Sequence, residues 1–141
     1  MTIAPAVLTR RGARLGAEVR YLEPQDQGRL ALNLLPNDRV AGRSRSMGVF
    51  DHEGSLERGL NYSAHVVRVS DDDYWKDFQG QTPVFTPRLL PLTARVERRY
   101  DTAPVDSSWY AGVQRWQVAQ SGDPTTAIRT PYDRVAQLGA R

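Results

Sequence analysis

The sequence contains no cysteine, so it can form neither a disulfide framework nor a thiolate metal site. It has two histidines, His52 and His65, and neither has a second histidine at a spacing typical of metal ligands. We therefore expect ordinary hydrogen-bonded or solvated histidines, with no metal and no other cofactor. Lysine is nearly absent, since Lys76 is the one lysine among 19 basic residues. A net charge of +3 is too small to argue for nucleic acid binding, and no nucleic acid partner is expected.

Long apolar segments are missing as well. Hydrophobic residues make up 40 % of the chain but occur in short runs, and the mean hydropathy is −0.55. No run approaches the roughly 20 residues that a membrane helix needs. The first eleven residues lack a basic segment followed by an apolar stretch, so they do not resemble a signal peptide. These absences argue against a helical membrane protein. They leave a transmembrane β-barrel open, because its strands alternate and score as polar on average.

The pattern that is present has a period of two residues, which predicts β-strands. In Ala13–Tyr21 every odd position is apolar, whereas the even positions hold arginine, glycine and glutamate. The same alternation occurs in Leu30–Leu34 and in Leu90–Val96. These three segments are the clearest predicted strands.

Weaker strands are predicted at residues 2–9, 44–53, 60–69 and 109–118 and from residue 134 onward. Connections rich in glycine, proline, aspartate or serine separate the strands, at residues 24–28, 36–38, 53–55, 80–87, 101–107 and 121–124. No segment has a convincing helical stripe. The sequence therefore predicts an all-β fold, an antiparallel meander of about eight strands that forms one unit over residues 1–141.

The polar positions of these strands carry charges of both signs close together, namely Arg14, Glu18, Arg20, Arg95 and Glu97. Opposite charges that pair across strands are typical of a hydrated barrel lumen, and they also fit the exposed face of a soluble sheet. Most tyrosines and tryptophans lie near predicted strand ends. There they indicate either the aromatic girdles of a membrane barrel or ordinary cross-strand packing.

Three stretches, in order, resemble the LptD family of lipopolysaccharide-assembly (organic solvent tolerance) proteins. The first is Pro5 with Leu8–Gly12 and Glu18–Leu22, the second is Leu35–Arg39, and the third is Asn61–Tyr62 with Arg68–Phe78. The matching motif positions to which we assign structural roles are Arg10, Arg11, Gly12, Pro36, Asn37, Asp38, Ser70, Asp71, Tyr74, Asp77 and Phe78.

The resemblance implies a non-enzymatic outer-membrane barrel of about 26 strands that delivers lipopolysaccharide to the surface of a Gram-negative cell. We expect this chain to be an internal piece covering roughly strands two to nine, without the periplasmic domain or the closing strands. The partners implied are lipopolysaccharide, the plug lipoprotein LptE, the periplasmic Lpt bridge and the barrel-assembly machinery.

Within such a barrel the five charged residues named above are expected to face the lumen. The apolar positions are expected to face lipid, namely Leu15, Val19, Leu30, Leu32, Leu34, Leu90 and Leu92. Pro5 lies inside a predicted strand, where it lacks a backbone donor. Its motif position resembles the proline beside the seam of the family's barrel, which implies a lateral gate.

Other readings of these residues were weighed. The aspartates at 71, 72, 73 and 77 suit a hard cation but lack the spacing of a calcium-binding loop, so a hydrogen-bonded turn is preferred. Ser70 and His65 form no recognisable catalytic triad. The main alternative is a soluble β-sandwich that binds carbohydrate through its tryptophans, and a hydrolase ranks last.

Overall fold

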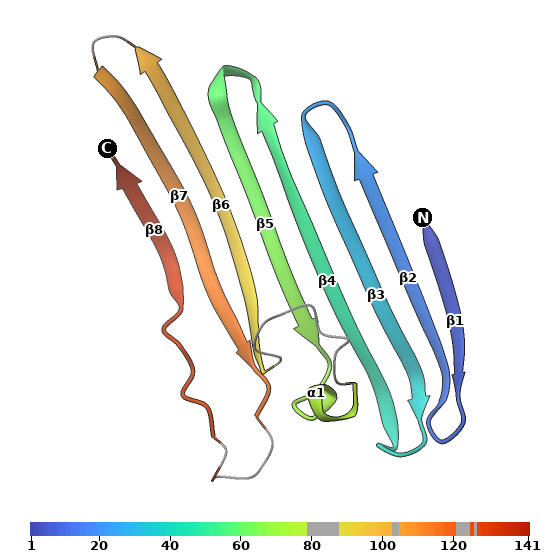
Figure 1. Cartoon of the computed structure of the whole chain (residues 1–141). Coiled ribbons are helices and arrows are strands. Elements are labelled where there is room, and N and C mark those ends of the chain that lie inside the picture. The colour runs from blue at the N-terminus through green and yellow to red at the C-terminus, as the bar shows by residue number, and fades with distance from the viewer. Residues whose placement is uncertain (79–87, 103–104, 121–124, 126) are drawn as a thin grey trace.

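The computed structural model describes residues 1–78, 88–102, 105–120, 125 and 127–141. The connections expected around residues 80–87 and 121–124 fall wholly or largely outside these residues. The described part forms one antiparallel sheet in which each strand pairs with the next along the chain (Figure 1). Its strands are β1 (Thr2–Leu8), β2 (Gly12–Leu22), β3 (Asp26–Asp38), β4 (Arg43–Leu56), β5 (Leu60–Val69), β6 (Leu89–Thr102), β7 (Val105–Val118) and β8 (Arg134–Ala140).

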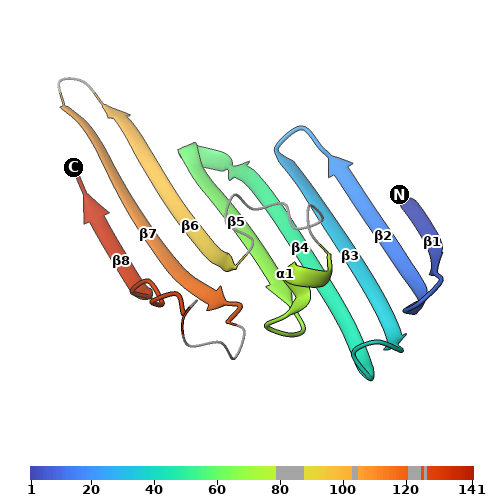
Figure 2. The same ribbon diagram turned by 60° about the horizontal axis from the view of Figure 1, so that its bottom comes forward.

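The predicted meander of about eight strands is thus confirmed, and the sheet is open. Strands β1 and β8 lie at opposite edges and do not pair with each other (Figure 1). Within the described residues, two short helical turns interrupt the meander: a 3-10 turn, η1 (Glu57–Gly59), and a single α-helical turn, α1 (Tyr74–Asp77). The helix α1 lies over one face of the sheet, near the end where β5 stops (Figure 2). None of the described helices is long or apolar enough to span a membrane.

Several strands continue through residues predicted as turns, which corrects the predicted boundaries. Gly28 and Gly54 belong to β3 and β4. A tyrosine ring from the neighbouring strand packs over the backbone of each glycine, where a side chain would otherwise lie. A Cβ at Gly28 would collide with the ring of Tyr21, and one at Gly54 with the ring of Tyr62. An aromatic ring packed over a cross-strand glycine is a known way to stabilise glycine within a sheet. Residues 36–38 also belong to β3, at an irregularity where its register with β4 shifts.

The core is small and lies beneath α1. Its buried members come from β3 to β6 and from the α1 segment, namely Ala31, Leu35, Met47, Val49, Val67, Tyr74, Phe78 and Leu90. Leu90 was predicted to face lipid, and this is wrong, because its side chain is fully buried in this cluster. The physical reason is a local separation of two strands. Pairing of β5 with β6 ends at Val66 and Leu92, so Leu90 lies beyond the paired region.

Candidate functional site

The pairing register divides the side chains of the sheet into two sets. Residues directly opposite one another on paired strands share a face, and the register pairs Leu15 with Leu34 and Glu18 with Ala31. Following these pairs from β1 to β7 defines a polar face and an apolar face. The polar face carries Arg14, Glu18, Arg20, Arg29, Arg95 and Glu97, and the apolar face carries Leu15, Val19, Leu30, Leu32, Leu34 and Leu92.

Charges on the polar face are mostly paired with one another. Glu18 lies between two arginines and accepts hydrogen bonds from Arg20 on its own strand and, at 3.2 Å, from Arg29 on β3. Arg95 donates to Glu97 at 3.0 Å. These side chains are partly exposed to solvent, so each pair contributes little stability. The arrangement gives a hydrated surface that can exchange hydrogen bonds with polar ligands.

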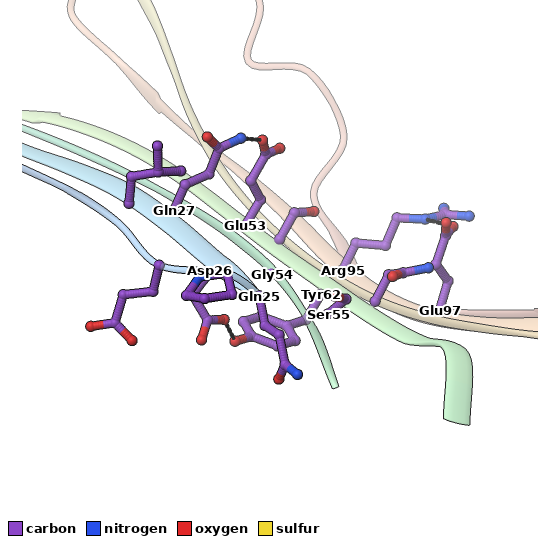
Figure 3. A pocket seen from close by; sticks show the side chains of 14 residues that line it. Gln25, Asp26, Gln27, Glu53, Gly54, Ser55, Tyr62, Arg95 and Glu97 are labelled. Atoms are coloured by element: carbon purple, nitrogen blue, oxygen red, sulfur yellow. Dashed lines mark hydrogen bonds and ion pairs between the residues drawn. The ribbon is translucent and has the colours of Figure 1, made fainter. Parts of the chain in front are cut away.

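A shallow cavity of about 480 Å³ opens where this face meets the turns that follow β2 and β4. Figure 3 shows the paired side chains of Gln27 and Glu53, and of Arg95 and Glu97, extending from one side of the sheet. On the other side Tyr62 donates a hydrogen bond to Asp26 (Figure 3). The cavity therefore offers acceptors and a few donors.

The apolar face ends in a belt of rings near the turns that join β2 to β3, β4 to β5 and β6 to β7. Tyr21 and Tyr62 contact the ring of His52, at centroid distances of 5.9 and 5.2 Å. Farther along, the indole N–H of Trp109 donates to the hydroxyl of Tyr100 at 3.4 Å. Tyrosine and tryptophan at this position suit the boundary between hydrocarbon and lipid headgroups. We call these five residues the aromatic belt; the tyrosine at 110 and the tryptophan at 116 lie on the polar face instead.

At the other end of the sheet, charged side chains from four segments meet around Arg45. This arginine donates to both oxygens of Asp71, at 2.9 and 2.7 Å, to Asp77, and to Asp38 at 3.4 Å. Arg11, in the turn between β1 and β2, also binds Asp38 at 2.6 Å and Asp77 at 2.5 Å. Two arginines thus bridge three carboxylates. The set of Arg11, Asp38, Arg45, Asp71 and Asp77 is called the arginine–aspartate cluster below.

Aromatic rings enclose this cluster and remove it from water. The guanidinium carbon of Arg45 lies 5.4 Å from the ring centroid of Tyr74 and 5.2 Å from that of Phe78. Arg45 and Asp38 are almost completely buried, with side-chain exposures of 1 % and 0 %. Buried charges are tolerated only when they are paired and hydrogen-bonded, and every charge here meets that condition. The cluster therefore fixes α1 on the polar face.

The two cluster aspartates outside the strands are held ionised. Burial opposes ionisation of Asp71, but hydrogen bonds from Arg45 and Ser70 outweigh it and lower the pKa of that carboxyl. Burial also opposes ionisation of Asp77, and hydrogen bonds from Arg45 and Arg11 lower its pKa below the ordinary value. Neither group is poised to exchange a proton near neutral pH, so the cluster is suited to holding α1 rather than to acid–base chemistry.

The structure brings most of the motif residues together at this one end. The hydroxyl of Ser70 accepts a hydrogen bond from the backbone N–H of Ser46 and donates one to Asp71. Gly12 has a φ of 110°, and a Cβ there would lie 3.0 Å from the carbonyl oxygen of Asn37, next to Pro36. Arg10 lies exposed in the same turn as Arg11.

Arg45, the centre of the cluster, was missed by the sequence reasoning, which found no motif in residues 43–46. Its partners lie 26 and 32 residues farther along the chain, so no local pattern reveals the contact. One signal was available in the sequence. The motif residues Asp38, Asp71 and Asp77 had no basic partner assigned to them, and Arg45 lies near the start of β4, close to the end of β3 that carries Asp38.

The geometry does not support a metal site at Asp71 and Asp77 or a catalytic role for Ser70 and His65. Asp71 and Asp77 are occupied by arginines, and among the described residues no group of three metal-ligating side chains converges. His65 binds Asp51 on the neighbouring strand, away from Ser70. Pro5 lies on β1 opposite Leu15, at one edge of the sheet. The tryptophans do not gather at one site, since Trp109 and Trp116 lie on opposite faces.

Comparison with known proteins agrees with this architecture. Residues 43–141 match the family model described as LptD, LPS transport system D. Two relatives called LPS-assembly protein LptD, from a Polaromonas and an Acidovorax species, are each 37 % identical over 147 aligned residues, covering 99 % and 97 % of this chain. Another, from Alkalilimnicola ehrlichii, is 36 % identical over 99 % of the chain. The chain spans 17 % of the length of each of these relatives.

Proposed function

The chain belongs to the LptD family, and we propose that it forms part of the wall of an outer-membrane β-barrel that assembles lipopolysaccharide in the outer leaflet. The observation that supports this most directly is the two-faced open sheet. A soluble sandwich would pack its apolar face against a second sheet. Here the described strands form one sheet, and the leucines at 15, 30, 32 and 34 remain about 40 % exposed.

In this proposal the apolar face contacts lipid and the polar face lines the lumen. Lipid would cover the exposed leucines, and the two open edges would pair with further strands of a longer protein, which would satisfy their backbone groups. The carbohydrate-binding alternative gains no support, because nothing packs against the apolar face among the described residues. The proposed role is transport, with no covalent step.

Single cysteines in the whole parent protein, each introduced as the only free thiol, test the orientation of the faces. We expect a membrane-impermeant maleimide to label Arg20→Cys in the water-filled lumen and to leave Leu32→Cys unlabelled within the lipid. Leu32 lies in the middle of β3, whereas Arg20 lies two residues before the end of β2. Glu18→Cys, which lies opposite Ala31 at nearly the depth of Leu32, should therefore be labelled as well. Labelling of Leu32→Cys without labelling of Arg20→Cys would reverse the assignment.

We also propose that lipopolysaccharide enters from the periplasmic Lpt bridge, that LptE occupies the lumen as a plug, and that the barrel-assembly machinery inserts the protein. Family membership supports these partners. The mixed charges and hydrogen-bonding groups of the polar face suit contact with a hydrated plug and with the phosphates and sugars of the cargo.

Pro5 is proposed to weaken a lateral gate. Pro5 lies on the edge strand β1. Because proline has no backbone N–H, one hydrogen bond fewer can form between β1 and a neighbouring strand. Each absent hydrogen bond lowers the cost of opening by roughly 0.5–1.5 kcal/mol. Pro5→Ala in the parent protein should reduce surface lipopolysaccharide while the barrel still assembles.

Pro91→Ala provides a matched control for this change, because Pro91 lies within β6 in the interior of the sheet, opposite Trp116. It should leave lipopolysaccharide export unchanged. Wild-type export and wild-type resistance to large antibiotics in Pro5→Ala would contradict the gate.

A further inference from the structure

Arg98 is a charged residue on the apolar face of the sheet. It lies on β6, opposite Leu60 on one side and Trp109 on the other, and thus on the apolar face. On the polar face Arg20, Arg29 and Arg95 all have acidic partners. Among the side chains that the structure describes, none forms an ion pair with Arg98, and its buried Nε lacks a hydrogen-bond partner. An arginine without an acidic partner on an apolar surface carries a charge that the protein leaves uncompensated, and an anion from outside the sheet can neutralise it.

The aromatic belt holds this guanidinium in place. Its central carbon lies 4.5 Å from the ring centroid of Tyr100, and the hydroxyl of Tyr100 accepts the hydrogen bond from Trp109. Stacking on a ring leaves the edge of a guanidinium free for bidentate contact, a geometry that matches phosphate oxygens. Arg98 is therefore oriented by its neighbours but not neutralised by them.

The position of Arg98 along the strand indicates which anion it meets. Charged residues on the apolar face occur near its ends: Arg98 and Asp26 close to the aromatic belt, and Arg68 and Arg115 toward the other end. Arg115 lies directly opposite Leu92, and between this level and Arg98 the register places only the uncharged residues Ala94 and Val96 on β6. This spacing places Arg98 at the level of lipid headgroups, where the available anions are lipid phosphates.

We propose that Arg98, positioned by Tyr100 and Trp109, is a binding site for the phosphate of a membrane lipid on the outer surface of the sheet. This proposal rests on the proposed function, since it requires the apolar face to lie in a bilayer. The site would anchor one lipid beside β6 and β7, apart from the lumen and from the edge strand β1.

The test uses the whole parent protein, purified in detergent and titrated with phosphatidylglycerol, with bound lipid counted by native mass spectrometry. Arg98→Gln should weaken one binding step roughly tenfold, which corresponds to about 1.4 kcal/mol, and Arg98→Lys should retain part of the affinity. Arg99→Gln is the matched control. It removes the same charge one residue along the strand, on the opposite face, and should bind as the wild type does.

A galactolipid, which has no phosphate, serves as the second probe and should bind equally to the wild-type and Arg98→Gln proteins. Wild-type phosphatidylglycerol binding in Arg98→Gln would overturn the site, as would an equal loss of galactolipid binding. The heat-dependent gel shift of a folded barrel and insertion into vesicles are measured in parallel. Failure of the wild-type protein to insert overturns the proposed function itself, whereas an inserted Arg98→Gln protein with unchanged lipid binding overturns only the site.

Discussion

Replacing Arg45 with methionine should release α1 from the polar face. The substitution keeps the unbranched apolar stem but removes the cation that three aspartates share. Breaking a buried ion pair by removing one partner costs about 3–5 kcal/mol, because the remaining charge is left uncompensated. Arg11 still binds Asp38 and Asp77, so we expect the lower end of this range. The stacking of the guanidinium between two rings is lost as well.

The measurement is urea unfolding of the whole parent protein in detergent, together with proteolysis of the segment around α1. Arg43→Met is the matched control. Arg43 lies two residues away on the same strand and makes one bond to Asp71, at 3.1 Å, but its side chain is 52 % exposed. Its loss should cost about 1 kcal/mol or less.

A double-mutant cycle with Asp71→Asn separates pairing from packing. The double variant should lose less stability than the sum of the two single variants, because removing Arg45 and the charge of Asp71 together leaves fewer unpaired charges. If Arg45→Met and Arg43→Met unfold at the same urea concentration and α1 resists protease equally in both, Arg45 does not hold α1 on the sheet.

Three further results are expected. The lowered pKa values of Asp71 and Asp77 mean that their contribution to stability is present above the ordinary aspartate pKa and is lost as the pH falls through the lowered values. The protection factors of the α1 amides, which correct the exchange rate for its intrinsic pH dependence, should therefore be constant from pH 7 to 5 and fall only below about pH 4. A fall in protection between pH 7 and 5 would contradict this assignment. Gly54→Ala would collide with the carboxylate of Asp26 and with the ring of Tyr62, which share a hydrogen bond, and should cost about 1–3 kcal/mol in urea unfolding. Gly48→Ala on the same face meets only Leu32 at 3.4 Å and should be nearly neutral, and equal costs would refute the role of this close packing. Gln117→Leu removes the two hydrogen bonds to the backbone of Val69 and should speed exchange of the Val69 amide, with Gln114→Leu as a control that leaves it unchanged.

The strands and the two faces could be predicted because alternation is a local property of the chain. In Ala13–Tyr21 successive side chains point to opposite faces of the strand. The register of β2 with β3 places apolar residues opposite apolar residues and so continues the same two faces across the sheet. The boundaries were less predictable. Gly54 reads as a turn residue in isolation, and it lies within a strand because Tyr62, eight residues later, covers it from the paired strand.

The centre of the arginine–aspartate cluster could not be predicted for a different reason. The motif of residues 70–78 indicates a hydrogen-bonded turn, and such a turn is present in part: the N–H of Asp73 donates to Asp71. Both carboxylate oxygens of Asp71 also accept hydrogen bonds from Arg45, which reaches Asp71 only because β4 and β5 pair with Met47 opposite Val69. The identity of the partner is therefore a consequence of the register, which the motif does not encode.

Leu90 shows where the alternation rule itself stops. Alternation follows from the extended backbone, and it predicts the surroundings of a side chain only where the neighbouring strands continue the same sheet. Beyond Val66 and Leu92 the ladder between β5 and β6 ends, and the amide of Gln117 takes the place of a strand by binding both the N–H and the C=O of Val69. Leu90 is then free to join Val67 and Tyr74 in the core, where its side chain is fully buried. The same separation of strands that defeats the prediction thus supplies an apolar contact for α1, so the helix is held by packing on one side and by the arginine–aspartate cluster on the other.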